Sequence, residues 1–170
     1  MSYGKGDTTA IFTGGWFRGI SLTAGEAIIE QIMAAVAAEV NTAALTDSEG
    51  HAIAAAVEVP PNFEDVTEAC VKVFPDGDDV TPNHSQTNEG VYRVNVALCE
   101  LVSAADVRFR HMKNREAVQD LFVGSRLVGM PAYYCRGVTS PSAISLEALE
   151  ERHHGISVVT LEFVALRSRG

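Results

Sequence analysis

The fold depends most on the segment VYRVNVALCELV, residues 91–102. A strand sends successive side chains to opposite faces, so apolar residues at alternate positions mark a strand with one buried face. In the first half of the segment, Arg93 and Asn95 separate the apolar residues, which predicts one dry face and one wet face. In the second half the intervening positions are apolar as well: Ala97, Cys99 and Leu101. The end of this strand is therefore expected to need cover on both faces, from its own chain or from another copy.

Further strands are expected on both sides of this segment. Residues 52–59 alternate and are stopped by two prolines, and residues 70–74 stop at a Pro-Asp-Gly turn. Residues 131–135 predict a short strand, and residues 155–166 predict a last strand that is apolar on both faces. Strands joined in this order favour antiparallel pairing between neighbours.

Two long polar segments separate these strands. Residues 76–90, DGDDVTPNHSQTNEG, predict a long hairpin loop, and residues 136–155 predict a second loop. Long loops in compact domains are commonly functional or disordered, so both segments are candidate contact regions.

Two amphipathic helices are expected. The first begins near Thr23, where TAGE matches a capping box with Glu26, and ends between Asn41 and Leu45. Its apolar residues recur at helical spacing: Ile28, Ile29, Ile32, Met33, Val36 and Val40. The second helix spans 114–130, with Asn114 as its cap and four residues facing inward: Ala117, Val118, Leu121 and Phe122.

These elements predict the α+β class. We expect a mixed, mainly antiparallel sheet of about five strands with two helices packed on one face. Residues 1–22 have no clear period and are expected to form an N-terminal arm, and residues 23–170 a single domain. The arm carries Trp16 and Phe17, which are expected to dock either on the protein's own core or on a neighbour.

Composition narrows the function classes. The 170 residues are 46% hydrophobic, enough for a folded core, and their formal net charge is −9. Such an acidic surface repels phosphate backbones and anionic lipid, so tight binding to nucleic acid or membranes is not expected. The three cysteines are isolated and odd in number, which argues against a disulfide framework, and the sequence starts without a signal peptide's apolar run. A reducing cytoplasm is the expected folding environment.

Motifs that would carry chemistry are missing from the sequence. His153 and His154 would point apart on an extended segment, and the other histidines lie in polar stretches: His51, His84 and His111. All five are expected to be exposed loop histidines. The DGDD stretch lacks the spacing of a calcium loop, and no nucleophile motif is present. We therefore predict no catalytic, cofactor-binding or metal-binding residue, and favour a non-enzymatic protein.

The order and lengths of these elements resemble small neck and tail proteins of tailed bacteriophages, most of all tail terminators. The resemblance covers residues 23–166 and includes no diagnostic motif. It is carried by LTAGEAIIEQIMAAV, AAAVEVPPNFEDV, VKVFPDG, VYRVNVALCEL and SVVTLEFVAL. The sequence departs from the pattern in its longer arm before residue 20 and in HSQTNEG, where an arginine is expected nearby.

This resemblance implies a virion structural protein that is assembled in the host cytoplasm and forms a hexameric ring capping the tail tube and joining it to the head. Its partners would be copies of itself, the tail tube protein and neck or connector proteins, while DNA would pass through without specific binding. The alternatives are a head-tail connector, a stopper, a tail tube subunit, or a small cytoplasmic enzyme or ligand-binding domain. The residues predicted to contact partners are Trp16, Phe17, Asp78, Asp79, His84, Arg136, Glu150, Arg152 and His153.

Overall fold

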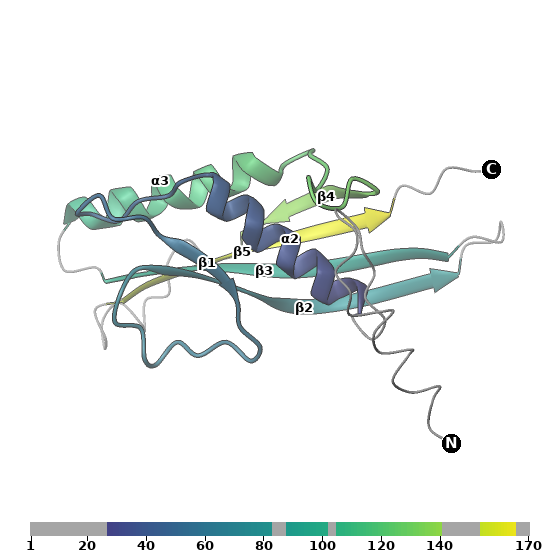
Figure 1. The fold of residues 1–170 in the computed structure, drawn as a ribbon, viewed down its shortest axis with the longest axis horizontal. Helices are drawn as coiled ribbons and strands as arrows, with labels where there is room; N and C mark the ends of the chain where they lie inside the picture. The colour runs from purple at the N-terminus through teal and green to yellow at the C-terminus, as the bar shows by residue number, and fades with distance from the viewer. Residues whose placement is uncertain (1–26, 83–87, 102–104, 141–153, 166–170) are drawn as a thin grey trace, which may run out of the picture.

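The computed structural model describes residues 27–82, 88–101, 105–140 and 154–165. Two helices pack against the same face of a single twisted sheet (Figure 1). The elements in chain order are α2 (Ile28–Thr42), β1 (Ala54–Val57), β2 (Cys70–Pro82), β3 (Asn88–Leu101), α3 (Ala105–Phe122), β4 (Tyr133–Thr139) and β5 (His154–Ala165). The predicted α+β class is confirmed.

The sheet has five strands in the order β1-β2-β3-β5-β4. β1 pairs with β2 in parallel, and every other pair is antiparallel. The segment 91–102 supplies most of β3, the central strand. Its apolar residues Tyr92, Val94, Val96 and Leu98 face the core, and Ala97 and Cys99, which point to the opposite face, are also fully buried.

The predicted polar loop over residues 76–90 is wrong, because most of it is strand. β2 continues to Pro82 and β3 starts at Asn88, so these residues extend a long hairpin. The expected Pro-Asp-Gly turn is a β-bulge instead: Pro75 pairs with Val94, Gly77 pairs with Arg93, and Asp76 is the extra residue. Polar residues are compatible with strand here because the hairpin runs past the packed core, where no apolar face is required.

The helix boundaries also differ from those predicted. Ala27 is extended and its amide is bonded to the Glu30 carboxylate at 3.1 Å, so α2 begins at Ile28 and not near Thr23. α3 begins at Ala105, about two turns before the predicted start, and Asn114 lies within it. It ends at Phe122 because Gly124 follows with φ of +66°, the left-handed conformation that terminates helices.

The hydrophobic core lies between the helices and the sheet. Alternate residues of β2, β3 and β5 face it, including Val73, Val96 and Leu161. α2 contributes a stripe of buried residues: Ile32, Met33, Val36, Ala37 and Val40. The helical spacing of that stripe was predicted from the sequence and places α2 across the strands.

The two edge strands of the sheet, β1 and β4, are partly covered by hydrogen bonds from neighbouring segments. On β1, the amide of Asn41 in α2 bonds to both backbone groups of Ala55: Nδ2 donates to the carbonyl at 3.0 Å and Oδ1 accepts from the N–H at 2.7 Å. On β4, the Cys135 N–H donates to the Ser125 carbonyl at 2.8 Å, and the Leu127 N–H donates to the Tyr133 carbonyl at 3.1 Å. These bonds satisfy strand groups that would otherwise be free to pair with another chain.

The Asn41→Ala substitution is expected to lower the free energy of unfolding by about 1–3 kcal/mol, because both backbone groups of Ala55 lose their partner. Chemical denaturation followed by circular dichroism measures this loss. Asn41→Asp is the informative comparison, since it keeps the acceptor for the Ala55 N–H but removes the donor to the carbonyl. A stability equal to wild type in Asn41→Ala would show that water replaces the amide at no cost.

A buried carboxylate on α2 binds the connection from α3 to β4, whose Leu127 and Met130 also lie in the core. Glu39 is buried and accepts a hydrogen bond from the Val128 N–H. Burial raises the pKa of Glu39 above its usual value of 4.5, although the Val128 N–H opposes this effect. The charged form of Glu39 is thus disfavoured in the folded protein. As pH rises from the unfolded-state pKa of 4.5 through the higher folded-state pKa, ionisation of Glu39 therefore lowers the free energy of unfolding.

Glu39→Gln is therefore expected to be more stable than wild type near neutral pH, because the amide oxygen still accepts from Val128 without carrying a buried charge. The difference should disappear below pH 4.5, where the wild-type carboxyl is protonated in both states. Urea unfolding at the two pH values measures the difference. A variant that is less stable than wild type near neutral pH would contradict this explanation.

Candidate functional site

A buried polar cluster joins α3 to the two central strands. His111 on α3 is fully buried; its Nδ1 lies 2.5 Å from Glu100 Oε2 on β3, and its Nε2 lies 2.8 Å from Ser157 Oγ on β5. His111, Asn114 and Val118 follow the helical i, i+3, i+7 spacing, so α3 directs all three at the sheet. The expectation that His111 is an exposed loop histidine is wrong, because its segment is helical and its polar atoms are satisfied by the strands.

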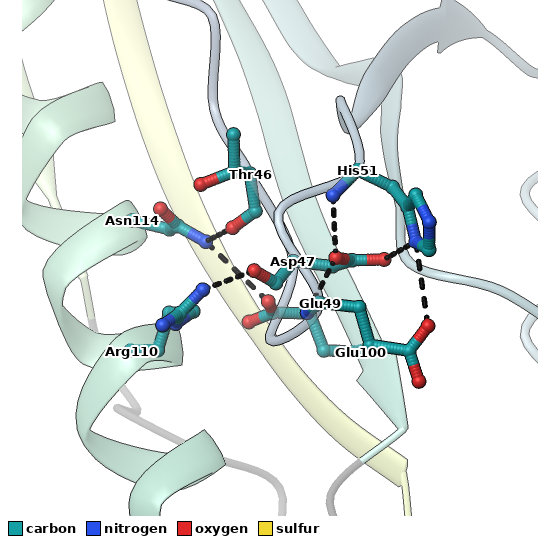
Figure 2. A network of polar contacts seen from close by, with 7 residues as sticks. All are labelled: Thr46, Asp47, Glu49, His51, Glu100, Arg110 and Asn114. Atoms are coloured by element: carbon teal, nitrogen blue, oxygen red, sulfur yellow. Dashed lines mark hydrogen bonds and ion pairs between the residues drawn. The ribbon is translucent and has the colours of Figure 1, made fainter.

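A second set of bonds extends the cluster to the turn before β1 (Figure 2). Asn114 Nδ2 donates to the Thr46 carbonyl at 3.0 Å and lies 3.4 Å from Glu100 Oε1. Arg110 donates to the Asp47 carbonyl. α3 thereby fixes the turn as well as the strands, and Asn114 is a buried crosslink and not the predicted helix cap.

The turn itself is organised by Asp47. Its Oδ1 accepts hydrogen bonds from the Glu49 N–H and the His51 N–H, both at 2.8 Å, and its Oδ2 lies 3.2 Å from His51 Nδ1. Desolvation opposes ionisation, but the two N–H groups and the His51 ring outweigh it and lower the pKa of Asp47. The carboxylate is therefore kept ionised, which suits an Asx turn that depends on its two acceptor bonds.

A hollow of about 430 Å³ lies beside this turn. Its wall carries four carboxylates and one imidazole: Asp47, Glu49, Glu68, Glu100 and His51. A cavity of this charge disfavours anionic ligands. Within the described ranges no group of three or more His, Cys, Asp or Glu side chains is arranged to hold a metal ion.

The order Ser157, His111, Glu100 has the connectivity of a serine hydrolase triad, but its position argues for a structural role. Ser157 lies within β5, is only 2% exposed and lines neither of the two hollows beside the cluster. A catalytic serine must present its oxygen to a substrate carbonyl, next to donors that stabilise the oxyanion. The three side chains instead bond the underside of α3 to β3 and β5.

The outer face of the sheet, opposite the helices, carries a separate ion-pair group. Glu162 on β5 accepts from Arg136 Nε at 2.8 Å and from Arg93 Nε at 3.2 Å. The Arg136 hydrogen bond, with help from Arg93, lowers the pKa of Glu162. Arg136 was predicted to contact a partner, and within the chain it is half-exposed and held at the β4 bulge by this pair.

Most of the other predicted contact residues lie outside the described residues: Trp16, Phe17, His84, Glu150, Arg152 and His153. Asp78 and Asp79 belong to the outer part of β2, where they pair with Tyr92 and Val91. The structure therefore places two predicted contacts on one projecting hairpin and a third, Arg136, on a different strand. It does not gather them into one site.

Sequence reasoning missed the buried cluster, although one signal pointed to it. Glu100 interrupts the apolar second half of the segment 91–102, and a carboxylate in a strand buried on both faces requires a polar or charged partner. The partner's identity could not be read, since His111 and Ser157 lie 11 and 57 residues away in sequence (111 − 100 and 157 − 100).

Two comparisons with known proteins find no relative of this chain. The sequence matches no protein-family model. A search of curated proteins also finds no match.

Proposed function

We propose that this chain is a non-enzymatic structural subunit that assembles with copies of itself, and that its assembly is a ring in the neck or tail end of a phage virion. The tail terminator is the specific role that we propose. A connector, stopper or tail tube subunit would need the same kind of self-assembling α+β domain.

The observation that carries the proposal is the projecting β2–β3 hairpin. β5 pairs with β3 only from Val91 onward, so the outermost pairs have no third strand among the described residues: Val80↔Gly90, Thr81↔Glu89 and Pro82↔Asn88. The hairpin runs past the ends of α2 and β5 (Figure 1). A two-stranded hairpin alone is only marginally stable in water, so we infer that this projection packs against a surface in an assembly.

The sheet edges support the same location for the contact. β1 is blocked by Asn41 and the first part of β4 by residues 125–127, whereas β2 beyond Val73 has no strand on its outer side in the described ranges. That open edge carries two prolines, a bulge and several aspartates, which are devices that prevent uncontrolled edge pairing. We therefore place the contact at the hairpin and favour docking of side chains over extension of the sheet.

The expected uncovered face at the end of β3 is wrong for residues 97–99. Ala97 and Cys99 are fully buried within a single chain, so no neighbour is needed to cover that part of β3. Leu101, which is 44% exposed, is the member of that face still available to a partner. Support for assembly thus comes from the hairpin and not from an uncovered second face at residues 97–99.

The rival candidate is a domain that binds a cationic ligand in the acidic hollow beside Asp47. Its specific support is the four-carboxylate wall. The two functions predict different oligomeric behaviour, because a binding domain has no need of the projecting hairpin.

The test is the oligomeric state of the full chain over a wide concentration range, by native mass spectrometry, sedimentation velocity and negative-stain imaging. We expect closed rings, hexameric if the terminator role is right. A variant with Thr81–Glu89 replaced by Asn-Gly, which forms a tight hairpin turn, should fold but remain monomeric. Val128→Ser, on the exposed connection after α3, is the control and should still form rings. A wild-type protein that stays monomeric throughout would refute the proposal, and rings in the shortened variant would exclude the hairpin as the contact.

A further inference from the structure

Two of the three cysteines are direct cross-strand neighbours, which their spacing in sequence conceals. Cys70 at the start of β2 pairs with Cys99 near the end of β3. Residues directly opposite in an antiparallel ladder have Cα atoms about 4.5–5.5 Å apart and side chains on the same face. Disulfides span Cα separations of about 4.4–6.8 Å, so the backbone already holds the two cysteines within bonding range. The cysteines are isolated in the sequence, and only the β2–β3 register brings this pair together.

The two thiols have different environments. Cys70 is half-buried, whereas Cys99 is fully buried. The neighbouring Cys99 thiol, against partial burial and with help from the Lys72 ammonium, lowers the pKa of Cys70 to about 7. The adjacent Cys70 thiol and burial raise the pKa of Cys99. Cys70 is therefore the accessible thiol with the larger thiolate fraction, and Cys99 is the protected thiol beside it.

We propose that Cys70 and Cys99 form a reversible dithiol–disulfide site that reacts with low-molecular-weight disulfides of the glutathione class. The Cys70 thiolate attacks one sulfur of the small disulfide, forms a mixed disulfide and releases one thiolate. Cys99 then loses its proton and attacks the Cys70 sulfur, which forms the Cys70–Cys99 bond and releases the second thiolate. The protein loses two electrons and two protons, and the small disulfide is reduced to two thiols.

Cys135 provides an internal control within the same sheet. It is fully buried on the helix side of β4, and Phe163, not a cysteine, lies opposite it on β5. Burial raises the pKa of its thiol to about 11. It lacks both the ionisation and the neighbour that the reaction requires, so it should remain reduced.

The bond would link β2 to β3 at the end of their ladder remote from the projecting tip. Closing the segment between residues 70 and 99 restricts the unfolded chain, so the oxidised protein should unfold at a higher denaturant concentration than the reduced one. This inference does not depend on the proposed assembly role, because the reacting pair lies within one chain.

The experiment uses the full chain, reduced and then incubated with glutathione disulfide, with samples quenched by N-ethylmaleimide and analysed by peptide mass spectrometry. We expect an intramolecular link between the peptides of Cys70 and Cys99, full maleimide labelling of Cys135, and no dependence of the yield on protein concentration. In Cys99→Ala, glutathione should stay attached to Cys70, and Cys70→Ala should abolish the reaction. Cys135→Ala should react like wild type.

The pH dependence gives a readout that simple proximity would not. The initial rate should rise with pH and level off above about 7, because the thiolate of Cys70 is the attacking species. A rate that keeps rising up to the ordinary thiol pKa of 9 would overturn Cys70 as an activated thiol. A glutathione adduct that persists on Cys70 in wild type, or a link that forms only between chains, would overturn the paired site.

Discussion

Replacing His111 with alanine is expected to lower the free energy of unfolding by about 3–5 kcal/mol. The substitution leaves the Glu100 carboxylate buried in the sheet, where its oxygen loses the partner now 2.5 Å away. It also removes the bond to Ser157 on β5, and thus both of the polar contacts that His111 makes with the strands. Urea unfolding followed by circular dichroism measures the loss.

The adjacent residue supplies a matched control. Met112 lies on the same helix but is 40% exposed, so Met112→Ala should change stability by no more than about 0.5 kcal/mol. A double substitution, His111→Leu with Glu100→Met, should recover much of the loss, because it removes both members of the buried polar pair together. If His111→Ala costs less than about 1 kcal/mol, or the double variant is no better than the single one, the cluster does not anchor α3.

Phe122→Ala is the second large effect, with an expected loss of about 3–5 kcal/mol. Phe122 is fully buried at the end of α3, and its ring meets that of Phe163 on β5 edge to face, with centroids 6.3 Å apart. Truncation removes this contact and leaves a cavity between the helix and the sheet. Denaturant unfolding is again the measurement.

Val123 tests whether the effect depends on burial and not on position in the chain. It is the next residue but is 62% exposed, so Val123→Ala should be nearly neutral, within about 0.5 kcal/mol. Phe122→Leu should fall between the two, because it keeps much of the buried volume but not the ring contact. Similar losses for Val123→Ala and Phe122→Ala would mean that the end of α3 tolerates repacking.

His111 and Phe122 explain how α3 stays on the sheet despite its polar sequence. Many of the residues in α3 are charged, and its apolar residues form no strong stripe that would mark where the helix starts. One end of its contact is made by Phe122 in the core and the other by His111 in the polar cluster. A helix held partly by buried hydrogen bonds is hard to recognise from apolar spacing alone.

The sequence alone determined the class, the strand content and the central strand of this protein. The alternation of apolar residues over 91–102 and the helical stripe from Ile28 to Val40 are local periodicities. The structure has a strand, β3, and a helix, α2, at these residues. The interior of each element is fixed by which of its faces is dry, and this information lies within the element.

Only the tertiary structure decided the boundaries and the sites. The hairpin continues through polar residues because β2 and β3 satisfy each other's backbone groups, a pairing that hydropathy does not encode. His111 is buried because Glu100 and Ser157 lie on two other strands, and Cys70 meets Cys99 because the β2–β3 register sets them opposite. In each case the deciding partner is distant in the chain, so only folding brings the groups together.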